Sequence, residues 1–389
     1  MVKIKQIAAR EEKGSFTVGN VIVCEVHLTN GVCATSTVLL ESLHENNVNV
    51  QISSAAIIEN IKNIISPFLE GKIIDIIECD ILLEEMYNAD LSSLIPPSVI
   101  HAISVALAEA QSIAEEIQPF ELFADLSQNE TITIPYPFFQ ISDNQTFDKN
   151  FPLQKIFLLP LGASSFRHSL GSFEVMQTAL KNHTLFSAGS SVENVFENIG
   201  EILTGAKLSD VFVLGAQGNA EMLHDDKNGN YKWLKESKTT EELLSLYKIF
   251  IEKYGLFSLQ NGFAVDDILG ARTLLEIFGD RVQLIANQSL AVDDMPALEA
   301  LKNHANACIV RPDDYITVTK ALTHVIQIRS ENINTIIAPR FAANPSFCVD
   351  FAVGTSAGQI KTFNDNQKLT TALFERLLDI EDTMTFSLL

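Results

Sequence analysis

Alternating apolar and polar residues near the start of the chain predict a β-hairpin. Val21–Leu28 and Gly31–Leu39 are rich in β-branched and apolar residues, as strands are. Between them stands Thr29-Asn30-Gly31, and an Asn-Gly pair is typical of a tight hairpin turn. We therefore expect two antiparallel strands joined at Asn30.

Two amphipathic helices are predicted after the hairpin. Apolar residues recur at helical spacing over Ala55–Glu70, and Gly71 is a favourable residue just beyond a helix end. Pro97–Glu116 begins with proline in the first turn and continues as a long apolar helix. Strands followed by helices are typical of an α+β domain. The polar segment 127–130 looks like a linker, so we expect this domain to cover residues 1–128.

Beyond the linker, short apolar strands alternate with amphipathic helices. Thr239 and Glu242 form a capping box at one helix start, and Asp266 or Asp267 can cap the next helix. Repeated strand–helix units over residues 129–389 predict a closed parallel (β/α)8-type TIM barrel, hence an α/β fold. The predicted strands are Asp210–Leu214, Leu256–Leu259, Val282–Ala286, Ala307–Val310, Asn334–Ala338 and Gly358–Ile360.

Composition limits the classes of function. A net charge of −22 argues against a nucleic-acid partner, because phosphate contacts need clusters of lysine and arginine. We find neither a signal peptide nor an apolar run of membrane-spanning length, so we expect a cytoplasmic protein without a membrane partner. The five scattered cysteines are interpreted as small buried hydrophobes in a reducing compartment. No CxxC pair or Cys/His spacing indicates a zinc site.

The chemistry of a TIM barrel lies at the C-terminal ends of its strands. Six residues stand at the ends of the predicted strands, and three of them are neutral and three cationic. They are Ala216, Gln260, Asn287, Arg311, Arg340 and Lys361.

Several segments resemble enolase, the lyase that interconverts 2-phosphoglycerate and phosphoenolpyruvate. They include LQKIFLLPLGASSF at residues 153–166, EKYGLFSLQNG at 252–262 and VDFAVGTSAGQIKT at 349–362, in the family's order. The resemblance implies an N-terminal α+β domain, a C-terminal TIM barrel with an irregular start, and a homodimer. It also implies a Mg²⁺ site made of three acidic residues at successive strand ends.

The magnesium site of the family is expected to be lost. The positions that match its three acids are Ala216, Gln260 and Asn287. Mg²⁺ needs anionic oxygen ligands to offset its dehydration, whereas alanine offers no oxygen and the amides offer only neutral ones. We therefore expect no cofactor.

The proton-transfer residues also differ from the family pattern. Arg311 stands where the family has its basic lysine, and a guanidinium cannot give up its proton to act as a general base. Lys155 replaces a family glutamate, and only Arg340 remains of a phosphate-handling His-Arg-Ser group. Phe341, in place of the small serine, could plug the mouth. Lys361 is the family residue retained inside an intact GQIKT motif.

The favoured function is therefore a catalytically inactive enolase-like protein with a binding, scaffolding or subunit-association role. Arg311, Arg340 and Lys361 would form a basic mouth that holds a small anion. In an alternative without ligand, these cations pair with local acids such as Asp313, Asp314 or Asp350.

Other functions stay open as alternatives. One is an enzyme with altered, metal-independent chemistry, and another is residual phosphopyruvate hydratase activity. The expected partner is a second copy of the chain or a genuine enolase, bound through the N-terminal domain.

Acidic clusters elsewhere suggest caps and turns rather than metal sites. The pairs Asp266-Asp267, Asp293-Asp294 and Asp313-Asp314 each precede a predicted helix, where aspartate caps free N–H groups. The segment Asp225–Asn230 resembles a calcium loop only faintly and lacks the terminal glutamate, so we expect a solvated turn.

Overall fold

The fold follows from a computed structural model of the 389-residue chain. The residues described are 1–15, 19–40, 52–89, 91–142, 151–181, 183, 190–286, 298, 300–339, 344–362 and 367–387, without the side chains of 91 and 385–387. Every structural statement below refers to these residues.

A three-stranded antiparallel sheet of order β1-β2-β3 opens the fold. Its strands are β1 (Ile4–Lys13), β2 (Asn20–Leu28) and β3 (Cys33–Leu39), so the predicted hairpin is confirmed. Gly31 has a φ of +92°, which glycine adopts without steric cost and which the hairpin turn requires. Strand β1 was not predicted, because its sequence IKQIAAREEK becomes too charged to show an apolar alternation.

Helices pack against one face of this sheet. The predicted helix over 55–70 is confirmed as three joined segments, α1 (Ser54–Asn60), the π-helical turn Ile61–Ile65 and α2 (Ser66–Leu69). The second predicted helix is α4 (Pro97–Glu115), and α5 (Pro119–Leu126) follows it. Helix α3 (Ile76–Ala89) was not predicted from the sequence.

A closed eight-stranded barrel of order β10-β11-β12-β13-β14-β4-β5-β6 forms the second part of the fold. Strand β5 runs antiparallel to both its neighbours, β4 and β6, whereas the other adjacent pairs are parallel. The prediction of a TIM barrel is confirmed, but the prediction of an all-parallel sheet is wrong at this strand. The strands are β4 (Tyr136–Gln140), β5 (Leu153–Leu159), β6 (Val213–Gly218), β10 (Leu256–Gln260), β11 (Gln283–Ile285), β12 (Ala307–Val310), β13 (Asn334–Ile337) and β14 (Gln359–Lys361).

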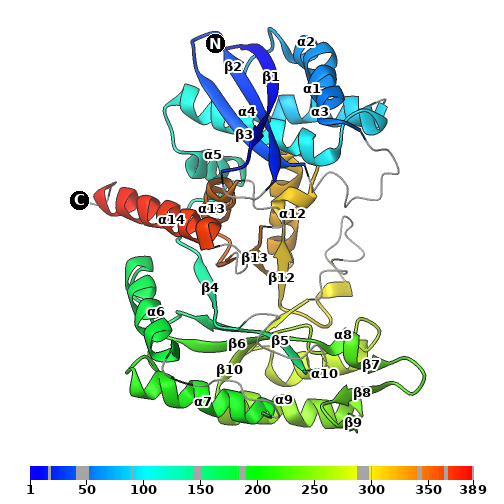
Figure 1. Ribbon diagram of the computed structural model, residues 1–389, viewed down its shortest axis with the longest axis vertical. Coiled ribbons are helices and arrows are strands. Elements are labelled where there is room, and N and C mark those ends of the chain that lie inside the picture. The colour runs from blue at the N-terminus through cyan, green and yellow to red at the C-terminus, as the bar shows by residue number, and fades with distance from the viewer. Residues whose placement is uncertain are drawn as a thin grey trace.

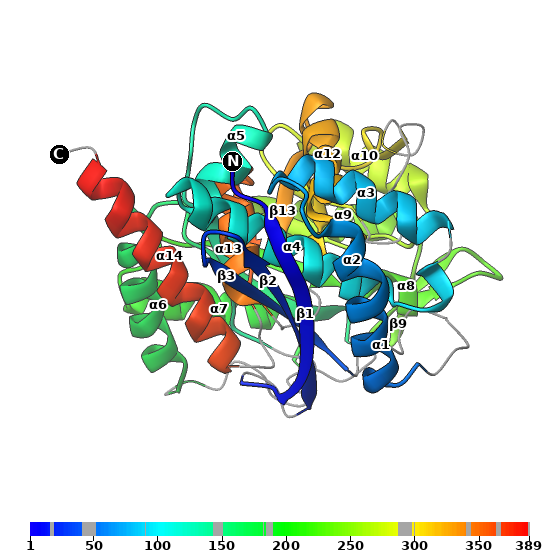
Figure 2. The same ribbon diagram turned by 90° about the horizontal axis from the view of Figure 1, so that it is seen from above.

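Helices surround the barrel strands. They are α6 (Phe166–Lys181), α7 (Val192–Gly205), α8 (Ala220–Leu223), α9 (Thr240–Tyr254), α10 (Ile268–Phe278), α12 (Val318–Ser330), α13 (Pro345–Gly354) and α14 (Gln367–Ser387). The Thr239–Glu242 capping box is present, and Gly255 ends α9 in the left-handed conformation with a φ of +68°. Figure 2 shows α14 running beside α6, which it contacts.

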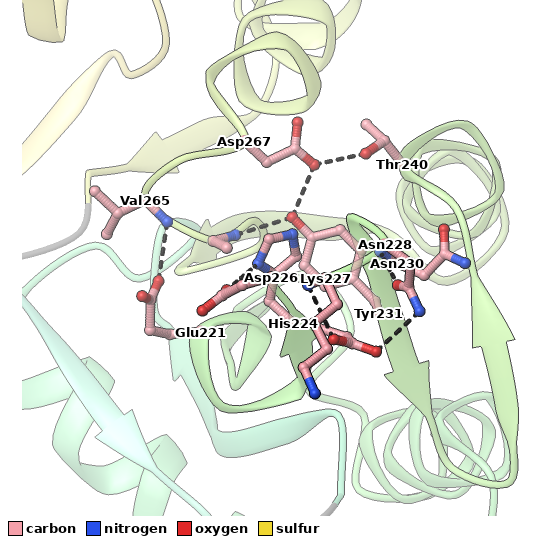
Figure 3. A network of polar contacts seen from close by, with 12 residues as sticks. Glu221, His224, Asp226, Lys227, Asn228, Asn230, Tyr231, Thr240, Val265 and Asp267 are labelled. Carbon is pink, nitrogen blue, oxygen red and sulfur yellow. Dashed lines mark hydrogen bonds and ion pairs between the residues drawn. The ribbon is translucent and has the colours of Figure 1, made fainter.

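Asp267 caps the start of α10, so it is the one of Asp266 and Asp267 that fulfils the predicted capping role. Its Oδ1 accepts from the Gly270 N–H at 2.9 Å, while its Oδ2 accepts from the hydroxyls of Tyr231 and Thr240, both at 2.7 Å. One carboxylate therefore joins the starts of α9 and α10 to a small sheet, as Figure 3 shows. That sheet comprises β7 (His224–Asp225), β8 (Asn230–Trp233) and β9 (Glu236–Lys238).

The buried apolar residues connect the two parts of the chain. The interior of the barrel has its own cluster, which includes Phe138, Phe157 and Ile309. A larger cluster joins the N-terminal sheet and helices to α12, α13 and α14, which lie between that sheet and the lower part of the barrel in Figure 1. Because this cluster crosses residue 128, the division into 1–128 and 129–389 stays a prediction. No helix in the described part of the chain is long and apolar enough to cross a membrane.

Candidate active site at the barrel mouth

Lys361 extends across the mouth of the barrel. It is the last residue of β14, and its Nζ donates a hydrogen bond to Gln260 Oε1 at the end of β10. These two strands lie four positions apart in the ring of eight, so they face each other across the barrel axis. The side chains of Lys361 and Gln260 together therefore span this end of the barrel.

Aromatic rings lie beneath the ammonium of Lys361. Its Nζ is 5.4 Å from the ring centre of Phe138 and 4.9 Å from that of Phe157. The two rings meet edge to face at 5.3 Å and belong to the apolar cluster inside the barrel. The ammonium thus lies above two aromatic rings, whose faces attract it.

Two further cations lie near Lys361 and change its protonation. The pKa of Lys361 is lowered from 10.5 to about 7. Burial is the largest cause, and the positive charges of Lys155 and Arg311 account for the rest. Lys155 reaches this mouth because β5 is antiparallel, so its start lies level with the ends of the parallel strands. Arg311 directly follows β12 and keeps an extended backbone. The structure thus brings together Lys155, Arg311 and Lys361 of the predicted cationic residues.

Neutral amides line the rim between these cations. Gln217 pairs in register with Lys155 on one side and with Gln260 on the other. Its Nε2 donates to Gln154 Oε1 at 2.8 Å, and Gln154 Nε2 donates to Asn219 Oδ1 at 2.7 Å. We did not single out these amides from the sequence, although Gln154 directly precedes Lys155. These described amides are neutral, so they add no negative charge to this part of the rim.

Ala216 is not at the mouth, contrary to the expectation from the sequence. Strand β6 covers Val213–Gly218 rather than Asp210–Leu214, so Ala216 lies inside the strand. It is buried in the apolar cluster between the barrel and its outer helices. The side chain that points into the mouth from β6 is that of Gln217, which is also neutral.

Three predicted residues lie outside the described part of the chain. They are Asn287, Arg340 and Phe341, and the pair Asp293-Asp294 lies there too. Their expected roles stay predictions.

Asp350, which we considered as a partner for the cations at the mouth, pairs with Arg376 instead. Asp350, on α13, accepts hydrogen bonds from Arg376 Nε and Nη2 of α14 at 2.6–3.2 Å. Burial raises the pKa of Asp350 to about 6, although the Arg376 guanidinium acts in the opposite direction. Asp350 therefore holds two outer helices together and does not neutralise the mouth.

Asp313, another acid considered as a partner for the mouth cations, lies near the buried thiol of Cys348. Asp313 lines a pocket with Cys348, and burial together with the charge of Asp313 raises the pKa of that thiol.

The calcium-like segment is a turn closed by its own side chains. Asp225 Oδ1 accepts from the Lys227 N–H at 3.1 Å, and Asn228 Nδ2 donates to Asp225 Oδ2 at 2.9 Å. Asn228 Oδ1 in turn accepts from the Asn230 N–H at 2.9 Å. Most side chains of this turn are exposed, which agrees with the predicted solvated turn.

Comparisons with known proteins point to one family. Residues 210–387 match the family model of the enolase C-terminal TIM barrel domain. The chain is also 28% identical over 306 residues to an enolase of Helicobacter pylori (strain Shi470), which covers 73% of this chain and 71% of that relative. These similarities agree with the closed barrel and with the motifs around Lys155 and Lys361.

Proposed function

We propose that this protein, which belongs to the enolase family, holds a small anion at its barrel mouth and does not catalyse the magnesium-dependent reaction of that family. The ligand class is a phosphate, a phosphorylated acid or a carboxylate. The protein would then act by binding or by association with another subunit.

One observation carries the proposal. The buried ammonium of Lys361 donates to a neutral amide, and burial lowers its pKa to about 7, with the positive charges of Lys155 and Arg311 acting in the same direction. Three neighbouring positive groups repel one another, and an anion between them removes that repulsion and forms charge-assisted hydrogen bonds. An anion is therefore the ligand that this set of charges favours.

The described donors at the family's metal positions do not fit Mg²⁺. Gln260 offers one neutral oxygen, and that oxygen already accepts from the Lys361 ammonium. The neighbouring Gln217 is also a neutral amide, and its Nε2 donates to Gln154. The side chain of Ala216 points away from the mouth and has no oxygen. A hard dication needs anionic oxygens that this part of the site does not supply. No step of the proposed function uses a metal.

Isothermal titration calorimetry with phosphoenolpyruvate, phosphate and sulfate tests the binding function. Binding favours the protonated lysine, so affinity should fall up to about tenfold per pH unit above pH 7. Lys361→Met should abolish the pH dependence and weaken binding, whereas substitution of the exposed Lys62 by methionine should change neither. Absence of binding at millimolar ligand would refute the proposal.

A coupled assay on 2-phosphoglycerate tests for residual family activity. We expect no turnover above background, with or without magnesium. A robust rate that EDTA removes would show that residues outside the described part of the chain supply the missing Mg²⁺ ligands. The protein would then be a working enolase.

A second candidate function is metal-independent chemistry at Lys361. A lysine with a pKa of about 7 is substantially neutral at physiological pH and can act as a base or nucleophile. In the nucleophilic case the amine adds to a substrate carbonyl, water leaves, and the resulting imine accepts hydride from borohydride. Mass spectrometry after borohydride treatment with 2-oxo acids should then find the adduct on Lys361. An unmodified Lys361 under these conditions would eliminate the imine mechanism.

We also propose that the protein associates through its N-terminal domain, either with itself or with a genuine enolase. Native mass spectrometry of protein purified from its own cell should find a stoichiometric dimer. A monomer would contradict this part of the proposal and leave the anion site unaffected.

A further inference from the structure

Three side chains with metal-binding atoms lie together on the N-terminal sheet, outside the barrel. Glu25 and His27 belong to β2, and Cys33 is the first residue of β3. One ligand atom of each residue lies within 4.8 Å of the other two. His27 Nε2 and Glu25 Oε2 are already 3.0 Å apart.

The antiparallel register creates this cluster. His27 and Cys33 are direct partners across the hairpin, and such partners carry Cβ atoms about 5 Å apart. Glu25 lies two residues before His27 and therefore projects from the same face of the sheet. That face is opposite to the one formed by Cys24, Val26 and Leu28, which pack into the core.

The cluster is open to solvent and can be reached by an ion. Cys33 is exposed, and the side chains of His27 and Glu25 are 34% and 18% exposed. Our expectation that the cysteines are buried hydrophobes is thus wrong for Cys33, although Cys24, Cys79, Cys308 and Cys348 are buried.

We propose that Glu25, His27 and Cys33 form a surface site for Zn²⁺. A thiolate, an imidazole and a carboxylate are the three kinds of ligand that zinc binds in proteins. The thiolate disfavours the hard cations Mg²⁺ and Ca²⁺. The thiolate and the carboxylate together carry two negative charges, and Arg10, which pairs with Glu25, carries one positive charge beside them.

The surroundings of Glu25 already place one of its oxygens for this role. Arg10 Nη1 contacts Glu25 Oε1, so the guanidinium holds that oxygen while Oε2 faces His27. Three protein ligands leave the fourth tetrahedral position of zinc for water or for a group from another molecule. Binding requires loss of the Cys33 thiol proton, so the affinity should rise with pH.

Spectroscopic titration of the full, reduced protein with Co²⁺, followed by competition with Zn²⁺, tests the site. We expect one equivalent of Co²⁺ per chain, with tetrahedral absorption bands and a thiolate-to-cobalt charge-transfer band that Zn²⁺ abolishes. Cys33→Ser should remove the charge-transfer band. Cys33→Ser and His27→Gln should each weaken zinc binding by more than about tenfold, since loss of even an outer-shell partner commonly costs that much.

A matched control is available elsewhere on the surface. His224 forms a comparable pair with Asp226, its Nδ1 lying 3.1 Å from Asp226 Oδ1, and among the described residues this pair is not part of a group of three possible metal ligands. His224→Gln should leave both the band and the zinc affinity unchanged. Circular dichroism of each variant checks that the sheet still folds.

Two outcomes would overturn the proposal. One is the absence of a thiolate-to-cobalt band in the folded, reduced protein. The other is wild-type zinc affinity in Cys33→Ser. Both are independent of the barrel mouth, so neither bears on the anion site.

Discussion

Replacing Lys361 by methionine should stabilise the protein while it destroys the proposed anion site. The pKa of this lysine is about 7 in the folded chain and 10.5 without burial, a difference of 10.5 − 7 = 3.5 units. At about 1.4 kcal/mol per unit, keeping the ammonium charged in the mouth costs at most about 5 kcal/mol. Methionine has a similar length and packs on Phe138 and Phe157 without that cost.

The gain is smaller than this upper bound, because the substitution also removes favourable contacts. The hydrogen bond from the ammonium to Gln260 contributes about 1.5–3 kcal/mol. We therefore expect the free energy of unfolding to increase by about 2–3 kcal/mol at pH 6.

The pH dependence distinguishes this cause from simple repacking. Between pH 7 and 10.5 the unfolded chain keeps the lysine proton that the folded chain has lost, so the stability of the wild type rises with pH in this window. The advantage of Lys361→Met should consequently shrink above pH 7 and vanish or reverse near pH 10. Urea unfolding of both proteins from pH 6 to pH 10 measures this, with Lys62→Met as the matched exposed-lysine control.

A stability difference that stays constant from pH 6 to pH 10 would refute the reasoning. Competitive acetylation followed by mass spectrometry supplies an independent measurement, since it reports the pKa of Lys361 directly. An acetylation profile typical of an exposed lysine would refute it as well.

Three further predictions concern charges, one at the barrel mouth and two elsewhere in the fold. Gln260→Glu places a carboxylate beside Lys361 and should raise its pKa well above 7 while weakening anion binding; unchanged acetylation of Lys361 would contradict this. Arg376→Met leaves Asp350, whose side chain is 4% exposed, without its partner and should cost about 3–5 kcal/mol in thermal unfolding; a loss below about 1 kcal/mol would show that water replaces the guanidinium. Burial raises the pKa of Asp80 from 3.8 to about 7, so its folded form holds the proton more tightly and stability falls as pH rises through this window. Asp80→Asn should therefore be stabilising relative to the wild type in urea at pH 8 but not at pH 4, and a pH-independent difference would rule out this account.

The sequence predicted turns and helix starts correctly where the interactions that form them join residues close together in the chain. The turn at Asn30-Gly31 depends on the backbone of two neighbouring residues, and the capping box of Thr239 on a contact three residues away. Such contacts are visible in the sequence because no other part of the chain takes part in them.

Strand β6 shows why other boundaries were misplaced. Its second half, Ala216-Gln217-Gly218, has no apolar run and did not suggest a strand. Hydrogen bonding to β5 on one side and β10 on the other makes it one. The pairing is non-local, so the inward side chain proved to be that of Gln217 and not that of Ala216.

The sequence by itself indicated the resemblance to enolase, predicted the barrel, and placed neutral and cationic residues after the predicted strands. Those conclusions follow from residue types in a fixed order along the chain, which folding does not change. Only the tertiary structure decided which groups meet. The reversed direction of β5 brought Lys155 to the mouth, closure of the ring placed Lys361 opposite Gln260, and the hairpin register joined His27 to Cys33. Direction, closure and register depend on hydrogen bonds between distant strands, and the order of residues alone leaves these undetermined.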